Sequence, residues 1–360
     1  MDPTVELTLE RRQCQVCHER VALKPCDVCK LVYYCCRAHQ HRDRAAHEHP
    51  CSVIKKALED LSRQDQDRTK MALKHRKVAT DTLNHFDNIV AVEFALGHLN
   101  EVLRLCPSDP DELRARDIIP TLFLRLGRDQ ECYDFIKCYD WAHPTRSLPY
   151  LDMRGEDPVE CPITALRVDG PMNMNHIMAA MLIKVRILLD LQNMQNATRA
   201  FQGVLRQDFI HMIRAQMPLV SNVVAAWKDI AEASVDKTAF FVKLLKVEVK
   251  VIFYRVQRTD PMFWPTFLVH EQLRQERVIR GPVATDASLQ RSIRYHYEPL
   301  RQERVIQGPV ATDAILQQLV VCDYHALAWR ETPGAIGMLE DLVRAATAKA
   351  AAAKAAAARE

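Results

Sequence analysis

Apolar residues recur at helical spacing along most of the chain after residue 52. Leu96, Leu99 and Leu103, three or four positions apart, share one face of a helix. The same periodicity predicts helices over about 89–105, 110–126, 131–139, 172–201, 204–215, 219–232 and 237–256. Only 9 glycines and 7% aromatic residues disfavour a sheet-rich fold. We therefore expect a mainly α-helical body made of helical hairpins.

Turn signals set the predicted ends of the early helices. Asp109 is a good N-cap, Pro110 suits a first helical turn, and Glu112 stands at the capping-box position. Gly127 is predicted to end that helix. The segment 124–133 resembles the turn inside a tetratricopeptide-type helical hairpin, and an ordinary antiparallel helical pair explains it equally well.

The polar segments between these helices suggest how the chain is divided. Residues 141–171 contain five prolines and two glycines, which predict a loop-rich connection. The end of the chain is an Ala/Lys run without an apolar stripe, which predicts a solvated helix. We divide the chain into a Cys/His-rich module (1–52), a helical connection (53–88), an α-helical domain (89–258), a helical and loop region (259–344) and an Ala/Lys-rich tail (345–360).

Residues 273–290 and 300–317 are almost the same sequence, offset by 27 positions. Only two of the 18 aligned pairs differ, namely Arg280/Gln307 and Ser288/Ile315. Selection on a folded repeat preserves the residues of its core and allows its surface residues to diverge. Here the polar positions match as well. We interpret the duplication as an insertion tolerated in a loop, with a functional array as the alternative.

Charge and hydropathy narrow the classes of function. The 49 basic and 46 acidic residues nearly balance, so no electrostatic argument favours nucleic-acid binding. The most apolar stretch, 177–191, is interrupted by Lys184, Arg186 and Asp190, and it is shorter than the roughly 20 residues that span a bilayer. The N-terminus has no basic start and no apolar run. We expect a soluble intracellular protein without a membrane partner, in nucleus or cytoplasm.

Cysteine and histidine residues crowd into one short stretch near the N-terminus. Seven of the 12 cysteines lie there, and the candidate ligands are Cys14, Cys17, Cys26, Cys29, Cys35, His39, His47 and Cys51. Zinc takes four thiolate or imidazole ligands, so eight ligands make two closed sites. A disulfide framework is the alternative, but disulfides do not need histidine. His18, His41, His49 and Cys36 are spare residues that could compete for either site.

The ligand pairs differ in their spacing. Cys14/Cys17 and Cys26/Cys29 are C-x2-C pairs, which suit a tight turn, whereas Cys35/His39 and His47/Cys51 are four residues apart. On a helix, that spacing places both side chains on one face. We therefore predict a short helix over about 39–47, with Pro50 ending it.

The stretch resembles the MYND-type zinc finger family, whose pattern ends in Tyr-Cys followed by two more ligand pairs, here Tyr34-Cys35 onward. The resemblance implies two interleaved zinc ions. The first would be held by Cys14, Cys17, Cys35 and His39, and the second by Cys26, Cys29, His47 and Cys51.

Three positions bear on what such a finger binds. His39 stands where the family usually has Cys, and imidazole is an acceptable zinc ligand. In relatives that bind proline-rich peptides, a Gln and a Trp on this helix form the groove. Gln40 matches the Gln, but Arg44 stands in place of the Trp and offers no aromatic face for proline.

The segments 188–191, 260–264 and 329–335, together with the finger, resemble a fungal group of MYND-finger proteins with a long helical C-terminal region. The expected function is a zinc-binding protein–protein interaction protein, adaptor or regulatory, whose finger presents a peptide- or partner-binding surface. We expect no enzyme activity. The alternative is a SET/MYND-type lysine methyltransferase, but only 13 residues precede Cys14 in this sequence, and neither an Asn-His-x-Cys motif nor a Gly-x-Gly cofactor loop is found. Direct DNA binding is disfavoured by the charge balance.

Overall fold

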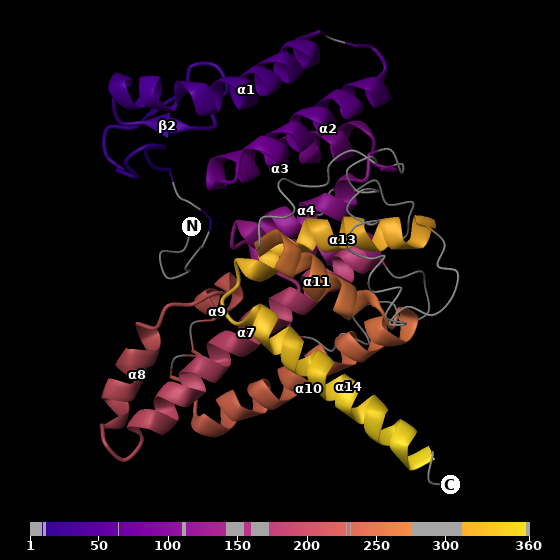
Figure 1. The fold of residues 1–360 in the computed structure, drawn as a ribbon. Coiled ribbons are helices and arrows are strands. Elements are labelled where there is room, and N and C mark those ends of the chain that lie inside the picture. The colour runs from indigo at the N-terminus through magenta and orange to yellow at the C-terminus, as the bar shows by residue number, and fades with distance from the viewer. Residues whose placement is uncertain are drawn as a thin grey trace.

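The computed structural model describes residues 9, 12–63, 65–109, 113–141, 155–159, 173–227, 229–230, 232–275 and 312–357. Within them, a small N-terminal finger leads into a body whose described elements are helices (Figure 1). The predicted fold class, a zinc-finger module followed by a mainly α-helical region, is confirmed. No described helix combines the length and hydropathy that a membrane span requires.

The finger is built from two short strands and the start of a long helix. Strand β1 (Lys24–Pro25) pairs antiparallel with β2 (Tyr33–Tyr34). Cys14 forms an isolated bridge with Tyr33, which ties the first loop of the finger to β2. Helix α1 (Arg37–Ser62) then carries the chain out of the finger.

Helix α1 continues through Pro50, so the prediction that Pro50 ends the helix was wrong. A proline within a helix leaves the carbonyl four residues earlier, here that of Ala46, without its helical partner. Ala46 is exposed and lines a cleft together with Pro50, so water can hydrate this carbonyl. The predicted boundary at residue 52 accordingly falls inside one continuous helix.

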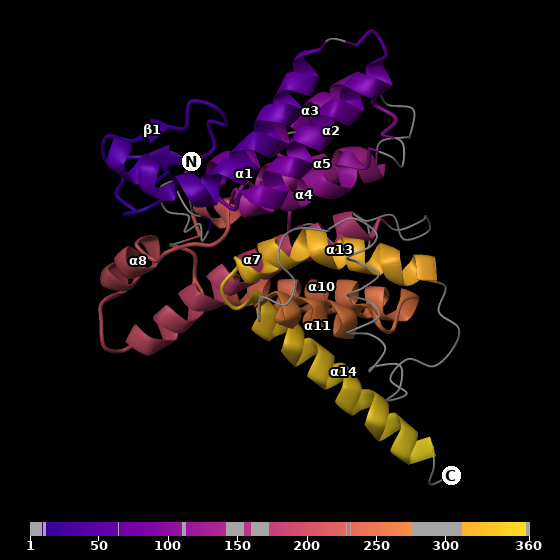
Figure 2. The same ribbon diagram turned by 45° about the horizontal axis from the view of Figure 1, so that its top comes forward.

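Three helices lead from the finger to the body. Helix α2 (Arg68–His85) begins at Asp67, whose side chain accepts hydrogen bonds from two backbone N–H groups. Helix α3 (Ile89–Leu105) begins at Asn88, which caps it in the same way through Ala91 N. Helix α2 packs along α3 and also contacts α1. Both views show the three helices running side by side (Figures 1 and 2).

Helices α4 (Ala115–Arg125) and α5 (Asp129–Trp141) form a tight hairpin. Gly127 has a φ of 65° and ends α4 as predicted. Its N–H donates to Leu124 O and the next N–H donates to Phe123 O, which is the Schellman arrangement. The tetratricopeptide-like character of the hairpin stays a prediction.

Asp109 caps α4 differently from the expected geometry. The helix begins at Ala115, six residues after Asp109. The Asp109 carboxylate nevertheless reaches it, accepting from Ala115 N at 2.9 Å and Arg116 N at 2.8 Å. Pro110 and Glu112 lie outside the described residues. The sequence therefore identified the capping side chain but not the loop that separates it from its helix.

Helix α7 (Met174–Phe201) is the axis of the body and is buried on nearly every side over its first two thirds. It contacts α4, α5, α8, α9 and α13. Met178 and Met181 lie in the core. Lys184, Arg186 and Asp190, which interrupt the apolar stretch in the sequence, are buried as well.

The remaining helices surround α7. They are α8 (Gln207–Ala215), α9 (Asn222–Ala226), α10 (Val235–Thr259), α11 (Phe263–Gln275), α13 (Thr312–Arg330) and α14 (Ala335–Ala357). Helices α10 and α13 pack on α7, and α11 packs on α13. Helix α14 starts against this group and then runs away from it to the C-terminus (Figures 1 and 2). Its last turns are exposed, as predicted for the Ala/Lys run.

Two sequence predictions fall largely outside the described residues. Of the 141–171 connection, only residue 141 and residues 155–159 are described. The first copy of the duplication contributes residues 273–275 to the end of α11, and the second contributes 312–317 to the start of α13. The interpretation of the duplication as a tolerated insertion stays a prediction.

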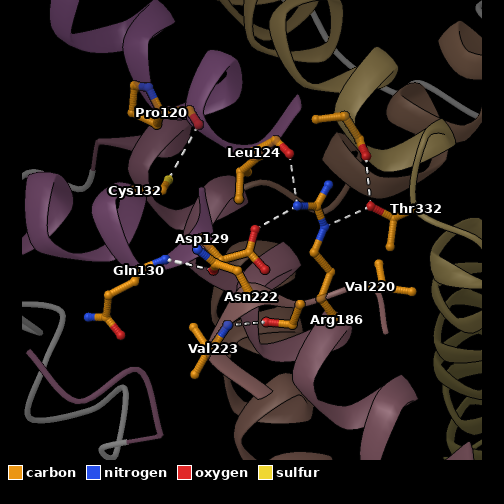
Figure 3. A network of polar contacts seen from close by, with 12 residues as sticks. Pro120, Leu124, Asp129, Gln130, Cys132, Arg186, Val220, Asn222, Val223 and Thr332 are labelled. Atoms are coloured by element: carbon orange, nitrogen blue, oxygen red, sulfur yellow. Dashed lines mark hydrogen bonds and ion pairs between the residues drawn. The ribbon is translucent and has the colours of Figure 1, made fainter. Parts of the chain in front are cut away.

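Two buried cations of α7 are paired with acids from other helices. Arg186 donates to Asp129 Oδ1 at 2.6 Å, to Leu124 O at 2.9 Å and to Thr332 Oγ1 at 2.9 Å, which Figure 3 shows. Lys184 pairs with Glu248 at 2.9 Å, and both side chains are buried. Removing one partner of a buried pair leaves an uncompensated charge, so these contacts specify how the helices fit together.

Asp190 is a buried acid on α7 whose pKa is strongly raised. Burial raises its pKa to about 7, and the nearby Asp129 adds to the effect. The N–H groups of Val220 and Ser221 donate to the carboxylate and partly oppose the shift. An unfolded aspartate titrates at about 3.9, so the folded protein binds the extra proton between about pH 4 and pH 7. Stability from this group is therefore fully present below pH 4 and lost as the pH rises to 7.

We predict that Asp190→Asn removes this pH dependence. Between pH 5 and pH 6.5, the difference in free energy of unfolding between the two proteins should change by up to about 1.4 kcal/mol per pH unit. Urea unfolding at a series of pH values measures it. Asp208→Asn serves as the control, because the Asp208 side chain is exposed. Its difference from wild type in free energy of unfolding should not change with pH. If the free energy of unfolding changes with pH in the same way in wild type and Asp190→Asn, the raised pKa of Asp190 is contradicted.

Candidate metal centre

Each C-x2-C pair sits on the same kind of backbone turn. His18 N donates to Cys14 O at 2.9 Å, and Lys30 N donates to Cys26 O at 3.1 Å. The residue that closes each turn is left-handed, with φ of 59° at His18 and 62° at Lys30. The two turns therefore present their sulfur pairs with the same local geometry, one pair to each prospective ion.

The first group brings together Cys14, Cys17, Cys35 and His39, whose ligand atoms all lie within 4.8 Å of one another. Cys17 Sγ is 3.6 Å from Cys35 Sγ. His39 Nδ1 is 3.5 Å from Cys14 Sγ and 3.1 Å from Cys35 Sγ. Cys14 and Cys17 come from the first turn, Cys35 from the bend between β2 and α1, and His39 from the first turn of α1.

The second group brings together Cys26, Cys29, His47 and Cys51 within the same limit. Cys26 Sγ is 3.8 Å from Cys51 Sγ, and His47 Nε2 is 3.4 Å from Cys26 Sγ and 3.6 Å from Cys29 Sγ. His47 and Cys51 lie one turn apart on α1. The two groups are interleaved along the chain, and their membership is the one that the family resemblance implied.

These distances fit zinc and exclude the disulfide alternative for the grouped sulfurs. A tetrahedral zinc site separates two sulfurs by about 3.8 Å and a sulfur from a nitrogen by about 3.6 Å. The sulfurs here are 3.6 and 3.8 Å apart, whereas a disulfide needs about 2.05 Å. Each group supplies three cysteines and one histidine, so the finger has two zinc sites, and four protein ligands fill each tetrahedron.

In each group the backbone lowers the pKa of one thiol, whereas desolvation raises the pKa of Cys29, Cys35 and Cys51. Burial raises the pKa of Cys14, but backbone N–H groups of Cys17 and Cys35 donate to its sulfur and lower the pKa to about 6 overall. Burial likewise raises the pKa of Cys26, and N–H groups of Cys29 and Val28 outweigh it and lower the pKa. Each site thus contains one sulfur that the fold already prepares as a thiolate.

The second site is also part of the contact between finger and body. The His47 ring lies 6.3 Å from the Tyr34 ring and 5.9 Å from the Phe86 ring, between centroids. One buried apolar cluster contains Cys26, Cys29, Leu31, Val32, Tyr34, Ile54, Phe86 and Ala91, with Val90 and Phe94 packed against it. Asn88 adds a hydrogen bond to Leu31 O at 3.3 Å. The finger is therefore packed onto α2 and α3, not suspended from a linker.

The spare residues lie outside both groups. His18, His41, His49 and Cys36 are exposed, and none is a member of a ligand group among the described residues. Sequence reasoning missed Phe86, which packs on a ligand ring from 39 positions away. Its only sequence signal is an aromatic residue between two helical segments.

A comparison with protein-family models matches the MYND finger to residues 14–51. Searches of curated proteins and of solved structures found no match. The N-terminal module is a MYND finger, a zinc-binding protein-interaction module with two zinc sites. The family match covers the finger alone, and the helical body lies outside it.

We predict that Cys26→Ser lowers the zinc content from two ions per chain to one, because a serine hydroxyl is a poor zinc ligand. Cys36→Ser is the matched control, since Cys36 is exposed and adjacent to the ligand Cys35. It should keep both ions. Elemental analysis of the purified chains gives the stoichiometry. Loss of an ion from Cys36→Ser, or two ions in Cys26→Ser, would refute the ligand set.

Phe86→Ala should loosen the second zinc site. Removing a group that supports a metal ligand commonly lowers metal affinity by about 10- to 100-fold. One of the two ions should therefore transfer to a chromogenic chelator at least about tenfold faster than in the wild type. Phe240→Ala is the control, because that ring is 62% exposed on α10. Identical release curves for wild type and Phe86→Ala would show that the body does not support the site.

Proposed function

We propose that this protein is a non-catalytic intracellular interaction protein, adaptor or regulatory, whose finger presents the partner-binding surface. The observation that carries the proposal is the closure of both zinc sites. Three cysteines and one histidine fill each tetrahedron, so no coordination position is left for water or substrate. Zinc in such a site stabilises a shape and supplies no Lewis-acid chemistry.

The surfaces beside the second site support this role. Helix α1 separates two hollows. One, of about 600 Å³, lies between finger and body and is lined by Asp43, Pro50 and Phe86 among others. The other, of about 440 Å³, lies over α1 and Val28, a valine that is 45% exposed. An exposed aliphatic side chain on a rigid, metal-held turn is a suitable contact for a partner.

A pull-down from cells that express the protein tests the proposal. We predict that Val28→Asp loses specific partners that the wild type retains, because it places a charge in the exposed hollow. Val204→Asp is the control, since Val204 is 77% exposed beyond α7. The double variant Cys14→Ser, Cys26→Ser should lose the same partners as Val28→Asp by breaking both zinc sites.

Zinc content must be measured alongside. Val28→Asp should keep two ions per chain, so that lost partners report on the surface and not on unfolding. If all partners survive both finger variants, the recruiting surface lies on the helical body and the proposal is overturned. Methyl transfer from S-adenosylmethionine by the purified protein would overturn the non-catalytic part.

A further inference from the structure

The hollow over α1 has a distinct chemical character, and we call it the outer groove. Its lining includes Val28, Gln40, His41, Arg44, Glu48 and Lys55. Val28 comes from the second C-x2-C turn, and the other five side chains come from α1. Because Cys29 and Cys51 are ligands of the same zinc site, the turn and the helix are held at a fixed separation.

The exposed lining of the groove is mostly apolar, although the groove is short. Val28 is 45% exposed, and the half-buried Cys51 lies beside it. The aliphatic carbons of Arg44 and Lys55 can extend this surface, because long basic side chains bury their stems while their charged ends stay in water. The groove therefore has room for one or two aliphatic side chains, not for a long apolar segment.

The charged rim is mainly basic. Two cations, Arg44 and Lys55, line the groove with one acid, Glu48, and the His41 ring lies in the same lining. Within the described part of the chain, Arg44 forms no ion pair, although Glu48 follows it by one helical turn. Lys55 pairs with Glu59 at 3.7 Å, but both side chains are more than half exposed, and such a pair contributes little. Both cations are therefore available to a ligand.

The two cations also have a defined spacing. Arg44 and Lys55 are 11 positions apart on α1, which returns them to nearly the same face of the helix and separates them by about 16 Å along its axis. An extended peptide rises about 3.3 Å per residue, so about five residues bridge that distance. Arginine binds carboxylates with two parallel hydrogen bonds, which fixes direction as well as charge.

We propose that the outer groove binds a short extended acidic peptide. An aliphatic side chain lies on Val28, and two carboxylates about five residues apart contact Arg44 and Lys55. This proposal rests on the proposed function of the finger as a partner-binding surface and names the class of partner. The basic rim is the reason for choosing an acidic peptide over a neutral or basic one.

Fluorescence anisotropy on the full zinc-loaded chain tests the proposal. The probes are degenerate decapeptides with one fixed leucine between two fixed aspartates about five residues apart, and sister libraries with asparagine or lysine in place of aspartate. The aspartate library should bind about tenfold tighter than the asparagine library, since charge-assisted hydrogen bonds are the stronger ones. Raising salt from about 50 mM to about 300 mM should reduce this advantage.

Charge reversal supplies the second arm. The double variant Arg44→Glu, Lys55→Glu should no longer bind the aspartate library and should bind the lysine library more tightly than the other two. Arg206→Glu is the control, because Arg206 is exposed near α8 and far along the chain from the groove. Each variant is used only after elemental analysis shows two zinc ions per chain, so that a change in binding reports on the groove.

Equal binding of the aspartate and asparagine libraries, or a preference that survives the charge reversal, would overturn the acidic-peptide assignment. A proline-rich peptide that binds regardless of residue 44 would do the same. If no library binds the wild type but cellular partners still depend on Val28, the ligand class is wrong while the proposed function stands. If neither peptide binding nor partner binding depends on the finger, the acidic-peptide assignment and the proposed function are both overturned.

Discussion

The second zinc site is the interaction on which the arrangement of this chain most depends. It joins the second C-x2-C turn to His47 and Cys51 in the middle of α1, and its histidine ring packs on Phe86 at the end of α2. A metal site normally organises only its own loops in a domain too small to form a core. Here the same four ligands also define how the finger meets the helices, because thiolates, Leu31 and Phe86 share one apolar cluster.

The arrangement of the helical body depends on charged side chains that are buried in its core. Lys184 and Arg186 lie within one turn of α7, and Asp190 lies about one turn further on. Each is paired or hydrogen-bonded to another segment. Arg125 adds a tie between α4 and Glu331 just after α13, with Asp87 from the α2–α3 turn as a further partner. Such pairs add little net stability over apolar packing, but a wrong arrangement would leave bare charges. They therefore favour one packing of the helices over others.

Helix α1 connects these two systems and also separates two surfaces of unlike charge. Its inner side, with Asp43 and Pro50, faces the cleft toward the body, and its outer side carries Arg44 and Lys55. The cleft also receives Asp87 and Glu331, so it is the more acidic of the two. Because both surfaces adjoin zinc ligands, binding at either would be sensitive to the loss of zinc.

The sequence by itself determined the eight ligands, the closed character of the sites, the helical periodicity of α3 and α7, and the stop at Gly127, because these depend on local spacing and on zinc chemistry. It did not determine that α1 runs through Pro50, since that depends on whether the Ala46 carbonyl can reach water in the folded protein. It identified Asp109 as a cap but not the loop that lets it act from six residues away. Lys184, Arg186 and Asp190 looked like interruptions of an apolar stretch, and only the tertiary structure supplied their partners from α10, α5 and the residues just before α9. The contact of Phe86 with His47 also required the tertiary structure, because a contact between segments far apart in the chain produces no periodic pattern in the sequence of either segment.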